Sequence, residues 1–184
     1  MNITGNARFL TTEDFIEKAV FSLLKKRDYD DFTIKEICKE AAINRSSFYA
    51  HYSDINDLMI KIEEKLARKL NEIWKPTDNY DENVFIPFFE FIKEYKVFYK
   101  AFAKSNSPSF AAPDMLKKQK DRFKQIIFGN INYSDTEIDY HLYYFGGGLK
   151  AICGLWLQND CKESPEEMAK IIHDEYANNA KYFK

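Results

Sequence analysis

A short segment of polar and basic residues, 44–51, has the composition of a helix that recognises nucleic acid. Asn44, Arg45, Ser46 and Ser47 open a predicted helix, and Tyr49 and His51 follow one turn later. Arginine and small polar side chains at a helix N-terminus can hydrogen-bond to base edges in a DNA major groove. We expect Arg45 and Ser46 to reach base edges, with Asn44 assisting.

Other polar groups of the same segment are suited to phosphate oxygens. Hydroxyls, cations and helix N-termini bind phosphates readily. The residues expected to do so are Thr33, Lys35, Ser47, Tyr49 and His51. The alternative is a helical corner with a solvated polar face.

Two short helices joined by a tight turn are needed to present these groups. Thr33 and Glu36 have the spacing of a capping box, which predicts a helix start at Thr33. Asn44 is a good second N-cap, worth about 1 kcal/mol over Ala. Phe48 and Tyr52 are spaced i and i+4, so both can point into a small core.

The stretch from Thr33 to Leu58 resembles the DNA-binding domain of the TetR family of bacterial transcriptional regulators. The family pattern is roughly T-x-x-x-I-A-x-x-A-G-V-S-x-x-T-F-Y-x-H-F-x-x-K-x-x-L. The chain matches it at Thr33, Ile37, Ala41, Phe48, Tyr49, His51 and Leu58, and conservatively at Cys38, Ile43, Ser47 and Tyr52. A first helix carrying Ile16, Ala19, Val20, Leu23 and Leu24 on one stripe also fits, so the resemblance covers about residues 11–58.

Two residues depart from the family pattern. Ala42 stands in the turn where the family usually has Gly, so a positive φ there would strain the backbone. Ile55 stands where the family usually has a Lys that contacts a DNA phosphate. Without that lysine, the affinity for DNA should fall less steeply as the salt concentration rises.

Composition sets limits on the mode of binding. The 184 residues are 45% hydrophobic and 16% aromatic, which is enough for a real core, and the formal net charge is −2. Residues 33–52 carry Lys35, Lys39 and Arg45 against Glu36 and Glu40, a net charge of +1. DNA binding would therefore rest on well-placed contacts and dimerisation rather than on bulk charge.

The sequence favours a soluble cytoplasmic protein. Its three cysteines, Cys38, Cys153 and Cys161, form no CxxC pair, which is typical of reduced thiols. No signal peptide is recognised at the N-terminus. The most apolar stretch, 142–157, is short for a bilayer span and contains Lys150, so no membrane association is expected.

The expected fold is all-α, with about nine helices. A loose arm over residues 1–10 precedes helices near 12–26, 33–41, 44–52 and 55–74. One helix is expected over 84–104, with Pro87 in its first turn, and others over 114–128, 134–159 and from Ser164 onward. We assign residues 1–54 to a helix-turn-helix DNA-binding head and 55–184 to a helical effector-binding and dimerisation domain.

A run of glycines within the predicted helix 134–159 suggests close approach of another helix. Gly147, Ala151 and Gly154 share one face, and each helical Gly costs about 0.8–1 kcal/mol relative to Ala. By the family resemblance, residues 140–158 and 165–183 would form a four-helix dimer interface that includes Ile172 and Tyr176. The alternatives are packing within one subunit and a kink that shapes a ligand cavity.

Aromatic residues are dense from Phe85 to Trp156. They can form an ordinary core or line a cavity for a small apolar or aromatic effector, as the family's second domain often does. The polar groups nominated for such a pocket are Tyr95, Tyr99, His141 and Tyr144.

No catalytic, metal or cofactor motif is found. His51, His141 and His173 lack metal-ligand spacing, and no paired cysteines accompany them. The function expected from the resemblance is a homodimeric regulator, most simply a repressor, on a pseudo-palindromic double-stranded operator. The first rival is an adaptor with the same fold that acts through a protein partner and binds DNA weakly. The second rival, a small helical enzyme, lacks a polar constellation to support it.

Overall fold

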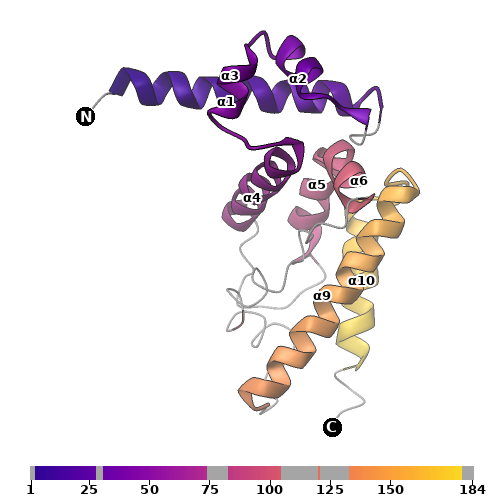
Figure 1. The fold of residues 1–184 in the computed structure, drawn as a ribbon. Helices are drawn as coiled ribbons and strands as arrows, with labels where there is room; N and C mark the ends of the chain where they lie inside the picture. Colours follow the sequence, from indigo (N-terminus) through magenta and orange to yellow (C-terminus); the bar gives the residue numbers. More distant parts are fainter. Residues whose placement is uncertain (1–2, 28–30, 74–82, 105–119, 121–132, 180–184) are drawn as a thin grey trace. The chain divides into compact units, whose positions relative to one another are not determined.

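The protein is all-α in the part of the chain described by the computed structural model, which covers residues 3–27, 31–73, 83–104, 120 and 133–179 (Figure 1). Eight helices lie within these residues, and contacts along the chain divide it into two compact units, Met1–Leu66 and Ala67–Lys184. The all-α prediction is confirmed. The predicted helix at 114–128 lies outside the described residues. The boundary predicted between the DNA-binding head and the second domain, at 54/55, stays a prediction.

The first unit consists of α1 (Ile3–Leu24), α2 (Ile34–Glu40), α3 (Arg45–Tyr49) and the N-terminal part of α4 (Ile55–Ile73). The α2 helix packs against both α1 and α3. The core of the first unit is built from the apolar stripes of these helices, with fully buried Ile16, Val20, Ile37, Phe48 and Leu58. This core fixes the helix-turn-helix against α1.

The expected loose arm at residues 1–10 is wrong, because α1 already begins at Ile3. Residues 3–12 contain no proline and only Gly5 as a helix-weakening glycine, so nothing in the sequence stops the hydrogen-bond ladder from extending toward the N-terminus.

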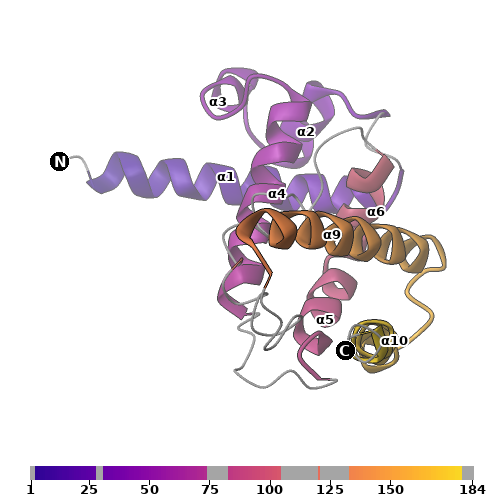
Figure 2. The same ribbon diagram turned by 90° about the horizontal axis from the view of Figure 1, so that it is seen from below.

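The second unit contains the rest of α4, α5 (Ile86–Glu94), α6 (Lys96–Lys104), α9 (Asp135–Gln158) and α10 (Pro165–Asn179). The α5 helix packs against α10, and α6 packs against α9 (Figures 1 and 2). The core of this unit is strongly aromatic, with fully buried Phe85, Phe88, Phe89, Phe98, Tyr99, Phe145 and Trp156.

The single helix predicted over 84–104 is wrong, because the chain breaks into α5 and α6 at Tyr95 (φ −100°, ψ 21°). Apolar residues cover most of the circumference of this segment, and one straight helix would leave part of that surface in water. The break lets the two halves meet different partners, α10 and α9. Pro87 lies in the first turn of α5, as predicted.

The start signals predicted for the last two helices are confirmed. Ser134 and Glu137 form a reciprocal capping box at α9. At α10 the Ser164 amide donates to the Glu167 carboxylate at 2.7 Å, and the Glu167 amide donates back to the Ser164 hydroxyl at 3.2 Å. These local bonds fix where each helix begins.

Candidate nucleic-acid interface

The helix-turn-helix begins at the capping box that the sequence predicts. The Glu36 amide donates to the Thr33 hydroxyl at 3.3 Å, and the Thr33 amide donates to the Glu36 carboxylate at 3.0 Å. Thr33 itself is exposed at this helix start. Its amide and its hydroxyl both donate to the Glu36 carboxylate in this state, so the phosphate contact expected of Thr33 stays a prediction.

The turn between α2 and α3 places Ala42 at φ 53°, in the left-handed region that favours glycine. The Ile43 amide closes the turn by donating to the Cys38 carbonyl at 2.9 Å. The position where the family usually has Gly therefore does take a positive φ. An alanine there costs roughly 1 kcal/mol in backbone strain.

Asn44 organises the start of α3. Its Oδ1 accepts from the Ser47 amide at 2.7 Å, which confirms it as the N-cap. The same oxygen accepts from the Ser46 hydroxyl at 2.7 Å and the Ser47 hydroxyl at 2.9 Å. In this state the hydrogens of both hydroxyls are used, and their oxygens remain as acceptors.

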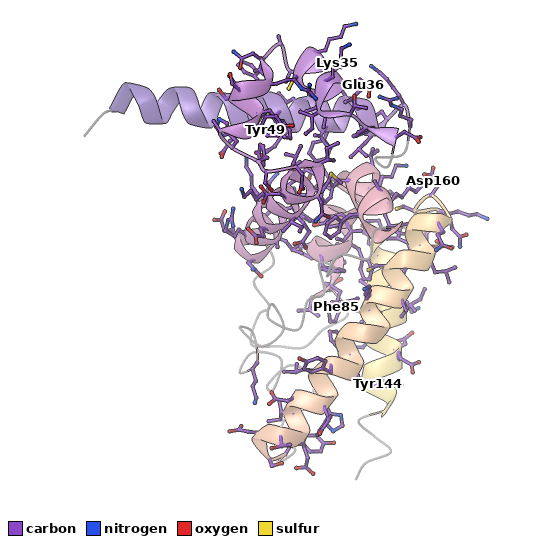
Figure 3. The ribbon with its side chains drawn as sticks, in the orientation of Figure 1. Lys35, Glu36, Tyr49, Phe85, Tyr144 and Asp160 are labelled. Atoms are coloured by element: carbon purple, nitrogen blue, oxygen red, sulfur yellow. The ribbon has the colours of Figure 1, made fainter. Side chains whose placement is uncertain are left out.

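Arg45 and Tyr49 form the exposed edge of α3. Arg45 is exposed, and Tyr49 is 54% exposed although it is a large aromatic side chain (Figure 3). The Tyr49 ring packs edge-on against fully buried Phe48, with 5.7 Å between ring centroids. Tyr49 is thus anchored to the core while its face stays open to a partner.

His51 is held inward rather than presented to solvent. Its side chain is 4% exposed, and Nδ1 lies 3.4 Å from Oε1 of Glu13 on α1. The ammonium group of Lys61 donates to the His51 carbonyl at 3.0 Å. The phosphate contact expected for the His51 ring stays a prediction, and it would require the ring to leave this position.

Acidic side chains on α2 are paired with Ser22 of α1, with Lys26 and Arg27 in the turn after it, and with the helix cap. Arg27 approaches Glu36 to 2.7 Å, and the hydrogen bond from Thr33, followed by that from Arg27, lowers the pKa of Glu36 to about 2. Glu40 accepts from the Ser22 hydroxyl at 2.6 Å, and this bond, with the charge of Lys26, lowers the pKa of Glu40.

Cations of the helix-turn-helix are free of such pairing. Lys35, Lys39 and Arg45 are exposed and make no ion pair with any described residue. Residues 33–52 carry a net charge of +1, and within them the two acids are paired while the three cations make no ion pair with a described residue. Lys39, which was not among the predicted contacts, is exposed on α2 one turn after Lys35.

The residues nominated for an effector pocket lie in different environments. Tyr99 is fully buried in the aromatic core, whereas Tyr144 is 77% exposed on α9. Tyr95 receives a hydrogen bond from Lys69, and the His141 ring packs on Tyr133 with 4.5 Å between centroids. The assignment of these four residues to one pocket stays a prediction.

The residues predicted for a dimer interface also differ in how buried they are. On α9, Gly147 and Ala151 are exposed and Gly154 is half-buried, and a Cβ added at either glycine would meet nothing within 4 Å. On α10, Ile172 is fully buried, while neighbouring Ile171 is exposed. The side chain of Tyr176 lies outside the described residues.

Within the described ranges, no cluster of three or more His, Cys, Asp or Glu side chains could hold a metal ion. No described helix is long and apolar enough to cross a membrane.

Comparison with known proteins identifies both halves of the chain. Residues 16–62 match the bacterial regulatory proteins of the tetR family, and residues 81–175 match the transcriptional regulator C-terminal region of the same group. The Bacillus subtilis (strain 168) protein YxbF, an uncharacterized HTH-type transcriptional regulator, is 27% identical over 173 residues. That alignment covers 88% of this chain and 44% of YxbF, so the chain spans less than half of that relative.

Two solved structures share the fold. The dihydroxyacetone kinase operon activator DhaS aligns with a TM-score of 0.65 at 21% identity, over 93% of this chain and 97% of its own. The TetR family repressor AlkX from Dietzia sp. strain DQ12-45-1b aligns with a TM-score of 0.50 at 14% identity, over 91% of this chain and 97% of its own. With the helix-turn-helix head and both family matches in place, the chain belongs to the TetR family of bacterial transcriptional regulators.

Proposed function

We propose that the protein is a cytoplasmic homodimeric repressor that binds a pseudo-palindromic operator. The observation that carries this proposal is the exposed edge of α3, where Arg45 and Tyr49 are available while the acids of α2 are paired with the cations that follow α1. Each α3 would enter a major groove, and the two copies would read half-sites about 34–36 Å apart.

Individual contacts follow from the hydrogen-bonding groups that remain open. Arg45 would donate to the edge of a guanine, which is the commonest specific contact in a major groove. Tyr49 and Lys35 would hold phosphates. Thr33 would join them only by releasing the hydrogen bonds that its amide and hydroxyl donate to Glu36. The Ser46 hydroxyl can accept from a base amino group while it stays bonded to Asn44. The phosphate contact predicted for Ser47 would require its hydroxyl to release Asn44.

An exposed apolar face of α9 supports the proposed dimer. Tyr140, Tyr144, Gly147, Ala151 and Leu155 follow one another at helical spacings of three or four residues, and all are exposed in the protomer. An exposed stripe of this kind marks an interaction surface. On α10, Ile172 is already buried in the protomer, so exposed Ile171 is proposed as a contact there.

The sign of regulation is assigned as repression because a dimer seated on a promoter blocks transcription by occupancy alone. The same fold occurs in DhaS, named as an activator, and in AlkX, named as a repressor, so the fold is compatible with either sign.

Control by a small apolar or aromatic effector is proposed to act through α4. Lys69 near the end of α4 donates to the Tyr95 hydroxyl at the break between α5 and α6, and α4 continues back into the head unit. A ligand bound beside Tyr95 could therefore alter the position of α4. It would regulate only if it favoured one arrangement of the two heads over another.

Selection of bound DNA from a random pool with the full chain tests the proposal. We expect an enriched sequence with two inverted half-sites, and affinity for it that falls steeply as salt rises. Arg45→Ala should lose preference at one position of each half-site, while Lys25→Gln, at an exposed cation in the turn after α1, should keep it. The proposal fails if no sequence is enriched or if Arg45→Ala selects the same site.

The adaptor role remains the second candidate because of Ile55, which takes the place of the family's phosphate-binding Lys. An adaptor with weak DNA affinity would show no enriched sequence and shallow salt dependence in the same selection.

A further inference from the structure

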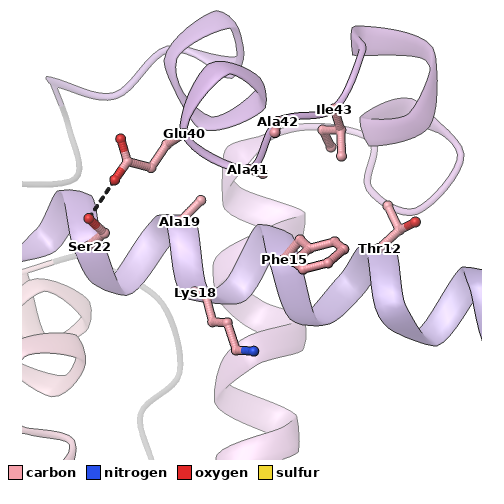
Figure 4. Close-up of a pocket in the computed structure, with 9 residues that line it drawn as sticks. All are labelled: Thr12, Phe15, Lys18, Ala19, Ser22, Glu40, Ala41, Ala42 and Ile43. Atoms are coloured by element: carbon pink, nitrogen blue, oxygen red, sulfur yellow. Dashed lines mark hydrogen bonds between the residues drawn. The ribbon is translucent and has the colours of Figure 1, made fainter.

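A pocket of about 720 Å³ lies within the head unit, between α1 and the turn that precedes α3 (Figure 4). One wall is the exposed edge of α1, and the other is the end of α2 together with the turn. The lining residues are Thr12, Phe15, Lys18, Ala19, Ser22, Glu40, Ala41, Ala42 and Ile43. Its volume is within the range of pockets that hold small organic ligands, about 300–1,000 Å³.

The body of the pocket is apolar. Ala19 and Ala41 are buried and form its floor, and Ile43 is half-buried at its edge. Phe15 is 49% exposed, so about half of the residue's surface is in contact with water. A flat apolar molecule placed against this ring would remove that surface from water, at roughly 25 cal/mol per Å² buried.

The two charged lining residues differ in their availability. Glu40 is engaged by the Ser22 hydroxyl at 2.6 Å and by Lys26 at 3.8 Å. Lys18 is exposed on the same face of α1 as Phe15 and makes no ion pair with any described residue. The available charge at the pocket is therefore positive, which favours an anionic ligand group.

We propose that this pocket binds a small organic monoanion with a flat aromatic body. The aromatic body would lie against Phe15 and Ile43, and its carboxylate or similar group would meet Lys18 at the outer rim. The pocket uses none of the residues assigned to DNA, to the dimer face or to the effector, so the proposal stands independently of the function proposed above. A molecule seated there would fill the space between α1 and the strained turn at Ala42.

Fluorescence anisotropy with 2-naphthoate and the full chain tests this site. We expect saturable binding of one equivalent per chain. Phe15→Ser should weaken it at least tenfold, and Ile73→Ser, which removes an apolar side chain of matched exposure (48%) from α4, should leave it unchanged. Lys18→Gln should weaken naphthoate about twofold to fivefold, as for an exposed ion pair, whereas Lys25→Gln should not.

The neutral analogue 2-naphthylmethanol separates the aromatic from the anionic requirement, since its affinity should be the same for wild type and Lys18→Gln. Unaltered melting and circular dichroism of the variants establish that the fold is intact. Absence of saturable binding, or naphthoate affinity unchanged by both Phe15→Ser and Lys18→Gln, overturns the proposal. A drop in sedimentation mass on Phe15→Ser would also overturn it, because a second copy of the chain would then cover the pocket.

Discussion

Nδ1 of His51 lies 3.4 Å from Oε1 of Glu13, which connects α1 to the end of the helix that carries Arg45 and Tyr49. The two residues are 38 positions apart in sequence, and the His51 side chain is almost fully buried. The contact makes His51 a positioning residue for α3.

Replacing His51 with alanine should destabilise the head without removing a phosphate contact. Loss of a buried hydrogen-bonding group costs about 1–3 kcal/mol in the free energy of unfolding. The slope of log affinity against log salt should stay unchanged, whereas Lys35→Ala should reduce it by about one per subunit. Urea unfolding and salt titrations on a selected operator measure both quantities. A reduced slope for His51→Ala would instead support the phosphate contact predicted for His51.

Ala42→Gly should stabilise the protein by about 0.5–1 kcal/mol. Relief of the left-handed strain at φ 53° exceeds the entropy that glycine adds to the unfolded chain. Ala50→Gly is the matched control, because Ala50 has φ −71° and glycine there should destabilise by about 0.5–1 kcal/mol. Urea unfolding of the two variants should therefore show shifts of opposite sign, and equal signs would contradict the strain at Ala42.

Features set by neighbours in the sequence could be predicted from it. The helix starts at Thr33, Asn44, Ser134 and Ser164 depend on bonds to groups two or three residues away, and all four are confirmed. The positive φ at Ala42 was indicated by the resemblance, because the family pattern has Gly at that position.

Features set by distant partners could not be predicted. The break at Tyr95 depends on α9 and α10, which supply the surfaces that α5 and α6 cover. The inward position of His51 depends on Glu13, and the pocket depends on Phe15 lying opposite Ala42. None of these pairings leaves a periodic or local signal in the sequence.

Stability in acid should depend on Glu36. Its pKa is lowered to about 2 by the hydrogen bonds from Thr33 and Arg27, so its contribution is complete above the unfolded pKa near 4.5 and is lost as pH falls toward 2. Melting temperatures of wild type should therefore fall more between pH 5 and pH 3 than those of Glu36→Gln. Arg27→Gln should show an intermediate fall, and identical pH profiles for all three would contradict the assignment.

Ile55→Lys should strengthen operator binding at low salt. A lysine at the start of α4 would supply the phosphate contact that the family pattern places there, and each added contact steepens the salt slope by about 0.9. A homodimer would gain about two such contacts, which salt titrations on the selected operator would detect. Ile55→Gln is the neutral control and should keep the wild-type slope. If Lys and Gln behave alike, position 55 does not approach the backbone of the DNA.

Gly147→Leu should separate the dimer into folded monomers. Within the protomer, a Cβ at Gly147 would meet nothing within 4 Å, so a larger side chain is tolerated there and raises helix propensity by about 1 kcal/mol. In a dimer that packs the exposed face of α9 closely, the same side chain would hold the two helices apart. Sedimentation of the variant should therefore give the monomer mass with unchanged helicity.

Leu155→Lys, on the same exposed face, should also give the monomer mass, because it places a charge in the interface. Dimer mass for both variants would exclude this face as the contact between subunits.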